Sequence, residues 1–175
     1  MKKCLCFFIC LIVGSTSSLL LAQEKPVRFS DIRSSLEEVI SKLSSNIKAF
    51  EDILVKMDES AKANENYNEQ KNIFLSSQFA ITSITAILEY NRDLLVLFGD
   101  LQGKNRKKFY EVRIESLQTS IDQINNMHKQ IQINYTILPP DFYEWQLIDR
   151  ERRLILSSID LLEQGIALLK SVNQK

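Results

Sequence analysis

The sequence predicts an all-α protein, an antiparallel up-down-up-down four-helix bundle that follows an N-terminal signal peptide. Three observations lead to this fold class. Four stretches repeat apolar residues at alternating spacings of three and four, which places one row of each helix in a shared core. The whole chain of 175 residues has only 4 glycines and 3 prolines, so it contains few residues that break helices. An apolar run behind two lysines opens the chain and has the form of an export signal.

The four rows have matching lengths, which supports one layered core in a single domain over residues 31–175. Each row covers roughly 24 residues, or about 36 Å of helix. Short connections between the stretches make neighbouring helices antiparallel. In chain order the rows are Leu36, Ile40, Leu43, Ile47, Phe50, Leu54, Met57; Phe74, Ser77, Ile81, Ile84, Leu88, Asn91, Leu95, Phe98; Tyr110, Ile114, Leu117, Ile121, Ile124, His128, Ile131, Tyr135; and Trp145, Ile148, Arg152, Ile155, Ile159, Leu162, Ile166, Leu169.

Residues 1–22 form the predicted signal peptide. Two lysines supply its positive start, residues 4–13 supply the apolar run, and small polar residues follow. We expect cleavage after Ala22, which gives a protein exported to a bacterial periplasm or secreted. If the signal is not cleaved, the segment from Leu5 to Ala22 is just long enough to act as a membrane anchor. All 3 cysteines lie in this segment, so we expect no disulfide and no thiolate site in the mature chain.

Residues 23–30 form the expected exposed lead, and Ser30 or Asp31 is the expected cap of the first helix. This helix runs to about Met57 and can continue through Ala61. The polar segment that follows holds neither proline nor glycine, which predicts a short connection to the second helix.

Glycine and proline mark the remaining helix ends. The second helix is expected to end at Gly99, and residues 100–105 connect it to the third. The two prolines at 139–140 end the third helix, because neither can donate a backbone hydrogen bond. Asp141 followed by Glu144 has the spacing of a capping box that opens the fourth helix.

The second helix is expected to be the most buried of the four. Between Lys71 and Asp100 only Glu89, Arg92 and Asp93 are charged. These charges, together with several serines and threonines, argue against a membrane span and favour a central core helix.

The charge balance argues against nucleic acid as a partner. The chain has 22 basic and 22 acidic residues, and without the two lysines of the leader the acidic residues are in excess by two. A protein that binds nucleic acid in general carries a clear basic excess.

Counting along the rows from one end of the bundle places the only histidine and an arginine in one layer. The layer comprises His128 and Arg152 with Phe50 and Ile81, and these four are the candidate ligand-binding residues. A buried polar group without a partner costs about 1–3 kcal/mol. Three explanations remain open. Arg152 can reach solvent from the edge of its row while His128 bonds a neighbour, the layer can fix the register of the helices, or it can line a pocket for a small molecule or cofactor.

The sequence predicts no catalytic residue, no metal ion and no cofactor. A di-iron bundle needs Glu-x-x-His pairs, and Asn125 stands three residues before His128. Haem ligation by His128 and Met57 needs a slip of the layers. The mature chain also lacks a cysteine, a phosphate-binding glycine loop and a Gly-x-Ser-x-Gly turn, so we expect a non-enzymatic protein.

A cluster of basic residues lies between the second and third helices. Lys104, Arg106, Lys107 and Lys108 fall at the end of the bundle that also holds the chain ends. They are candidate contacts for anionic lipid or for an acidic partner. Alternatively, they complement the negative C-terminal end of the second helix.

The sequence favours a protein that binds another protein or serves as a scaffold at the cell envelope. Small-molecule or cofactor binding near His128 and Arg152, and binding to anionic lipid through the basic residues, are the alternatives. The third helix is rich in uncharged amides, which form either a solvated face or an interaction surface. Further apolar rows on the second and fourth helices could bury a homodimer interface: Ile73, Ile87, Leu94, and Leu147, Leu154, Leu161, Leu168.

Overall fold

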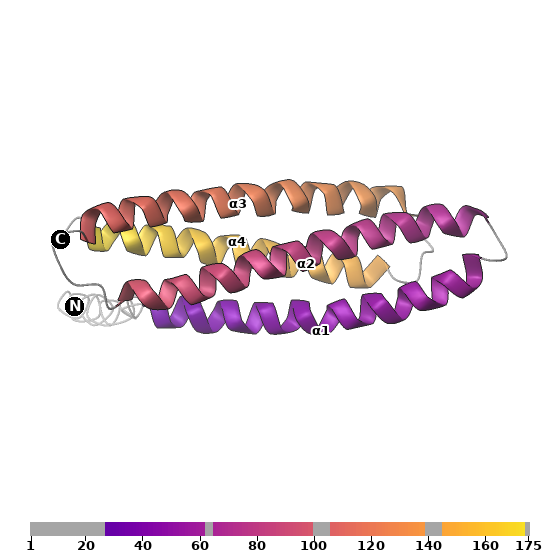
Figure 1. Cartoon of the computed structure of the whole chain (residues 1–175), viewed down its shortest axis with the longest axis horizontal. Helices are drawn as coiled ribbons and strands as arrows, with labels where there is room; N and C mark the ends of the chain where they lie inside the picture. Colours follow the sequence, from indigo (N-terminus) through magenta and orange to yellow (C-terminus); the bar gives the residue numbers. More distant parts are fainter. Residues whose placement is uncertain (1–26, 62–64, 100–105, 139–144, 174–175) are drawn as a thin grey trace, which may run out of the picture.

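The protein is all-helical in the computed structural model, which describes residues 27–61, 65–99, 106–138 and 145–173. The helices are α1 (Phe29–Ala61), α2 (Glu65–Gly99), α3 (Arg106–Ile137) and α4 (Trp145–Asn173), and the described residues contain no strand (Figure 1). The predicted all-α class with four helices is confirmed. The predicted signal peptide, the prolines at 139–140, and the capping pair Asp141 and Glu144 lie outside the described residues.

The four helices lie side by side, and successive helices run in opposite directions along the long axis (Figure 1). Contacts join α1 to α2, α2 to α3, α3 to α4, and α4 back to α1. Helix α2 also contacts α4, whereas α1 and α3 lie diagonally across the core, with no Cα pair within 8 Å among the described residues. Helices α2 and α4 therefore each contact all three other helices, so the position of α2 is no more central than that of α4.

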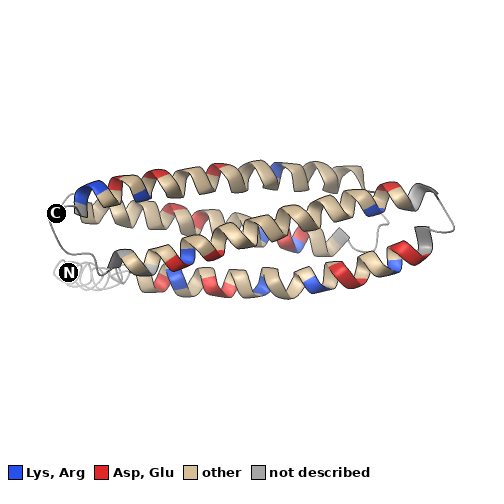
Figure 2. Cartoon of the chain, viewed as in Figure 1, with Lys and Arg blue, Asp and Glu red and all other residues tan. Residues whose placement is uncertain are grey.

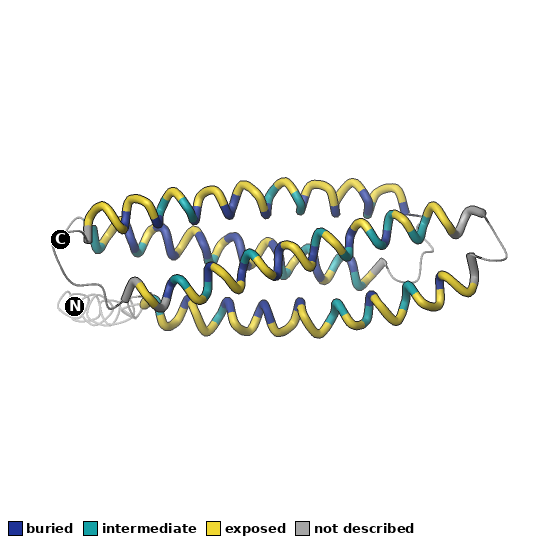
Figure 3. Tube along the Cα trace, in the orientation of Figure 1, coloured by how far each residue is buried: buried dark blue, intermediate teal, exposed yellow. Residues whose placement is uncertain are grey.

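One continuous apolar core follows the predicted rows (Figure 3). Leu117 and Leu162 are 0% exposed, and the rings of Phe50 and Phe74 stack with their centroids 4.6 Å apart. Burying an aliphatic or aromatic side chain stabilises the fold by about 1.5–3 kcal/mol, so these rows hold the helices together. The additional rows on α2 and α4 are partly buried against this core: Ile73, Ile87, Leu94, Leu147, Leu154, Leu161 and Leu168.

At three places the structure corrects the assignment of residues to rows. In each of three neighbouring pairs, the second residue is assigned to the apolar row but is only half-buried, while the first residue is buried. The pairs are Arg113 and Ile114, Asn134 and Tyr135, and Glu151 and Arg152. Residues three and four positions along a helix both lie near the same face, so the spacing alone allows either member. A charged or amide side chain occupies the interior in all three pairs, and in the third pair both members are charged.

The C-terminal ends of α1, α2 and α3 agree with the expected ones, and the start of α1 differs. This helix begins at Phe29, and the carboxylate of Asp31 accepts a hydrogen bond of 3.0 Å from the backbone N–H of Arg28. Asp31 therefore caps the helix from inside its first turn, where a carboxylate can reach back to a free N–H group. Helix α2 ends at Gly99 as expected, and α3 ends at Ile137, two residues before the first proline of the pair.

Helix α2 contains the one stretch of the described chain that is long and apolar enough to cross a membrane, Asn68–Leu95. The core helix of a helical bundle has the same length and composition. About a third of the stretch is buried among the other helices, so one face of α2 remains exposed.

Candidate functional site

Helices α2 and α3 together form an exposed surface, the α2–α3 face, which combines apolar side chains with few charges over residues 72–88 and 116–137. No residue between Asn72 and Leu88 is charged. Between Ser116 and Ile137 only Asp122 and Lys129 carry a full charge. Figure 2 shows long uncharged stretches on α2 and α3, whereas charged residues follow one another along α1.

Large apolar residues are exposed along the whole α2–α3 face. Phe79 and Leu97 are 65% and 63% exposed, and Tyr90 is 58% exposed. They recur at helical spacings, so each helix presents them on one side. The exposed large apolar residues of the face are Phe79, Tyr90 and Leu97 on α2, and Phe109, Val112, Ile133 and Ile137 on α3.

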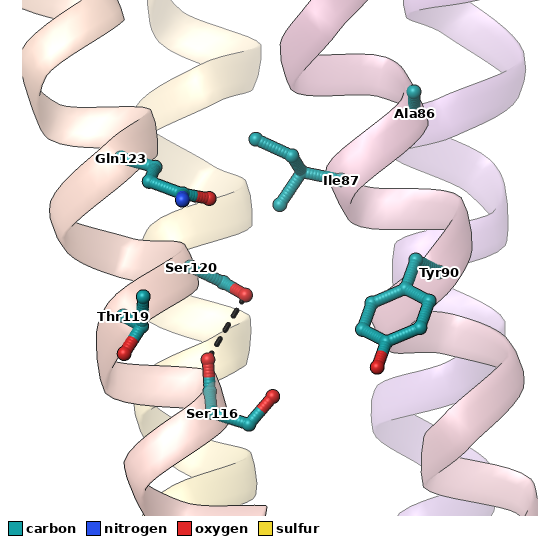
Figure 4. A pocket seen from close by; sticks show the side chains of 7 residues that line it. All are labelled: Ala86, Ile87, Tyr90, Ser116, Thr119, Ser120 and Gln123. Atoms are coloured by element: carbon teal, nitrogen blue, oxygen red, sulfur yellow. Dashed lines mark hydrogen bonds between the residues drawn. The ribbon is translucent and has the colours of Figure 1, made fainter.

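A groove of about 440 Å³ lies in the middle of the α2–α3 face (Figure 4). Short side chains on both helices leave this space open. The hydroxyl of Ser120 donates a hydrogen bond of 3.0 Å to the carbonyl of Ser116, so it stays against its own helix. Ile87 and Gln123 extend toward the opposite helix in Figure 4. The groove is lined by Ala86, Ile87 and Tyr90 of α2, and by Ser116, Thr119, Ser120 and Gln123 of α3.

Arg113 borders this groove from the interior. It is 2% exposed, and its Nη2 donates a hydrogen bond of 2.8 Å to Oδ1 of Asn91. Its Nη1 donates a hydrogen bond of 3.1 Å to Oγ of Ser116, and its guanidinium lies 5.9 Å from the ring centre of Tyr90. Burial lowers the pKa of Arg113 to about 10, which leaves it charged at neutral pH. Arg113 therefore holds two groove-lining residues, Ser116 and Tyr90, in place.

A second polar link joins α2 and α3 further along the molecule. The amide nitrogen of Asn134 donates hydrogen bonds of 3.0 Å to Oγ of Ser77 and 3.3 Å to the carbonyl of Ile73. Asn134 is 4% exposed. The buried amide is satisfied only in this register of the two helices, so the link fixes α2 and α3 along their common axis.

The structure brings the predicted residues His128 and Arg152 together. His128 is 8% exposed, and burial together with the charge of Arg152 lowers its pKa. The guanidinium of Arg152 lies 4.7 Å from the ring centre of Tyr135, and its Nη1 is 3.7 Å from a carboxylate oxygen of Asp149. Nε2 of His128 and Nε of Arg152 are buried without a hydrogen-bond partner in the described part of the chain.

The other two candidates of that layer, Phe50 and Ile81, lie in the apolar core. Both are 0% exposed, and Phe50 stacks on Phe74. Phe50 belongs to α1, whereas His128 belongs to α3. The polar pair His128 and Arg152 stands between α3 and α4.

Sequence reasoning missed Glu151, which is 0% exposed. Asn46 of α1 donates a hydrogen bond to Oε1 of Glu151, and Arg150 donates one of 3.0 Å to Oδ1 of Asn46. Oε2 of Glu151 is buried without a partner among the described residues, and burial raises the pKa of this carboxyl to about 7. The available signal was the spacing from Ile148, which fits Glu151 as well as it fits Arg152.

The predicted basic residues are described in part. Lys107 and Lys108 are exposed in the first turn of α3, and Arg106 is the first residue of that helix. Lys104 lies outside the described residues. Among the residues that are described, no group of three or more His, Cys, Asp or Glu side chains could hold a metal ion.

Comparisons with protein-family models, with curated proteins and with solved structures found no match to this chain. The function must therefore be argued from the chemistry of its own surfaces. The α2–α3 face and its groove form an exposed apolar feature that the packing of the four helices does not require.

Proposed function

We propose that this protein is exported as an antiparallel four-helix bundle and acts, without catalysis, by binding another protein at the cell envelope. Its signal peptide would be residues 1–22, and its binding surface the α2–α3 face. The observation that carries the proposal is the groove between α2 and α3, set in a surface with exposed aromatic residues and few charges.

The composition of the α2–α3 face is that of a protein interface. The central area of such interfaces is poor in charged residues and rich in aromatic ones, and a polar rim surrounds it. Here Phe79 and Tyr90 supply the aromatic rings, while Thr119 and Gln123 supply hydroxyl and amide groups beside the groove. An apolar side chain of a partner can fill the groove above Ile87, and its backbone can bond the hydroxyl and amide groups.

A site-specific crosslink in the native host tests this proposal. A photoreactive residue placed at Ala86 or Thr119 should give one discrete crosslinked product, because both positions line the groove. The same residue at Asp160, which is exposed on α4, is the matched control and should give none. Introducing arginine at the other groove position, as in Thr119→Arg with the probe at Ala86, should abolish the product.

The identity of the product decides between partners. A product of twice the chain mass identifies a second copy, whereas any other discrete mass identifies a different protein. No product from either groove position, or an equal product from Asp160, would show that the α2–α3 face is not a binding surface.

A second candidate function is the binding of a small molecule beside His128 and Arg152. The observation in its favour is that Nε2 of His128 and Nε of Arg152 are buried without a hydrogen-bond partner among the described residues. Native mass spectrometry of gently purified protein tests it, because a bound molecule adds mass. Added mass that is lost in Arg152→Gln supports this function, and an unliganded mass rejects it.

A further inference from the structure

One end of the molecule combines exposed lysines with exposed apolar side chains. The start of α1, the end of α2, the start of α3 and the end of α4 all lie at this end, on the left in Figure 1. We call the following residues the basic end: Val27, Leu97, Lys107, Lys108, Phe109 and Val112, all of them exposed.

The register of α2 against α3 places members of the basic end on adjacent helices at the same level. The hydrogen bond from Arg113 to Asn91 fixes that register. Six residues further along α2 is Leu97, and six residues back along α3 is Lys107. Because the two helices are antiparallel and rise by about 1.5 Å per residue, these two positions lie at the same height.

Among the described residues, the lysines of the basic end have no acidic partner. Neither Lys107 nor Lys108 forms an ion pair within the described part of the chain. Asp93 pairs with Arg92 at 2.8 Å and Asp31 lies 3.7 Å from Arg28, and Glu111, exposed one turn along α3, forms no ion pair with either lysine among the described residues. The positive charge of the basic end is therefore available to an external anion.

We propose that the basic end docks on an anionic lipid surface. Lysines place their ammonium groups among lipid headgroups, while aromatic and aliphatic side chains enter the interface between headgroups and acyl chains. Residues 108, 109 and 112 supply both kinds of group within one turn of α3. Each lysine near an anionic surface contributes about fivefold in affinity. The apolar side chains beside the lysines, Leu97, Phe109 and Val112, favour a lipid interface over a purely ionic contact with an acidic protein.

The position of the chain before α1 supports the same orientation. The predicted apolar segment ends at Ala22, and α1 begins at Phe29 at the basic end. Seven residues span at most about 25 Å. If that segment stays in a membrane as an anchor, it holds the basic end close to the membrane surface. This proposal uses the end of the molecule, so it does not depend on the groove.

Co-sedimentation of the full-length protein with vesicles tests the proposal. Vesicles of phosphatidylcholine are compared with vesicles that also contain phosphatidylglycerol. The double variant Lys107→Glu/Lys108→Glu should partition at least about tenfold less onto the anionic vesicles and equally onto the neutral ones. The matched control Lys48→Glu/Lys129→Glu makes the same charge change at exposed positions outside the basic end and should bind as the wild type does.

A second measurement locates the contact. Tryptophan placed by Phe109→Trp in a Trp145→Phe background should be quenched by brominated lipid, whereas Ile137→Trp near the opposite end should not. Equal partition of the two charge-reversal variants would overturn the proposal, and so would equal quenching at both positions. If an acidic protein binds the wild type but not the Lys107/Lys108 variant, and vesicle binding is the same for both, the lipid proposal is wrong and the basic end binds that protein. Vesicle binding by Thr119→Arg should equal that of the wild type, because this substitution blocks the groove and leaves the basic end unchanged. The lipid proposal and the groove proposal can therefore fail independently.

Discussion

Replacing Glu151 by glutamine should remove a pH dependence of stability that the wild type shows between mildly acidic and mildly basic conditions. The folded protein holds the proton of this carboxyl more tightly than the unfolded chain, because burial raises its pKa from 4.5 to about 7. Its contribution to stability is complete below pH 4.5 and is lost as the pH rises through 7. Glutamine can still accept the hydrogen bond from Asn46 but carries no charge at any pH.

The size of this effect follows from the two pKa values. A difference of one pKa unit between the folded and unfolded states changes the free energy of unfolding by about 1.4 kcal/mol. For Glu151 the total change in the free energy of unfolding is therefore at most about 3 kcal/mol. Between pH 5 and pH 8 the free energy of unfolding should fall by about 2–3 kcal/mol. The side chain is 0% exposed, so solvent screens this effect little.

Urea denaturation followed by circular dichroism measures the quantity directly. The free energy of unfolding is determined for wild type and Glu151→Gln at several pH values from 5 to 8.5. The difference between the two proteins cancels the contributions of all other titrating groups. That difference should shift by about 2–3 kcal/mol in favour of the variant as the pH rises. A difference that stays constant within about 0.5 kcal/mol would show that Glu151 ionises as freely in the folded protein as in the unfolded one.

Three further changes probe other parts of the helix packing. Leu162→Ala or Leu117→Ala should lower the free energy of unfolding by about 2–5 kcal/mol, because each leucine is fully buried; an unchanged melting temperature would contradict the row assignment. Gly165→Ala should stabilise by up to about 1 kcal/mol, since the added methyl group would lie 3.6 Å from Leu95 and 3.9 Å from the side chain of Leu117; a lower melting temperature would show that the site is tighter. His128→Gln should reduce the loss of stability as the pH falls below 6.5, because the lowered pKa of His128 makes the folded state bind fewer protons there than the unfolded chain; identical urea titrations of both proteins at pH 5 would exclude this.

The sequence predicts the helices better than it predicts which polar residues they bury. The apolar rows give the four helices because burial of a continuous apolar stripe dominates helix packing. At Arg113, Asn134 and Glu151 the neighbouring residue continues the row equally well, so the spacing alone does not select the buried member. Each of these three side chains finds a hydrogen-bond partner on another helix. Partners of this kind depend on the register between helices, which a single row does not contain.

The α2–α3 face could be predicted only in part. The uncharged amides of the third helix predict either a solvated face or an interaction surface, and Gln123, one of these amides, lines the groove. Phe79 and Tyr90 give no such signal, because a helix with apolar residues on every side has the sequence pattern of a fully buried core helix. Their exposure follows from the number of helices packed around α2, and the sequence of α2 does not specify that number.

The two polar links between α2 and α3 have a consequence for any partner of the groove. Arg113 with Asn91 and Asn134 with Ser77 lie on either side of it, about 31 Å apart along α3. Sliding one helix past the other by a turn would break both links at once and leave buried donors unsatisfied, at a cost of about 1–3 kcal/mol each. The two hydrogen-bonded links thus fix the register of α2 and α3 on both sides of the groove, so the groove is preformed before a partner binds. A partner would spend little of its binding free energy on ordering the site, so even a small contact area there can give a specific complex.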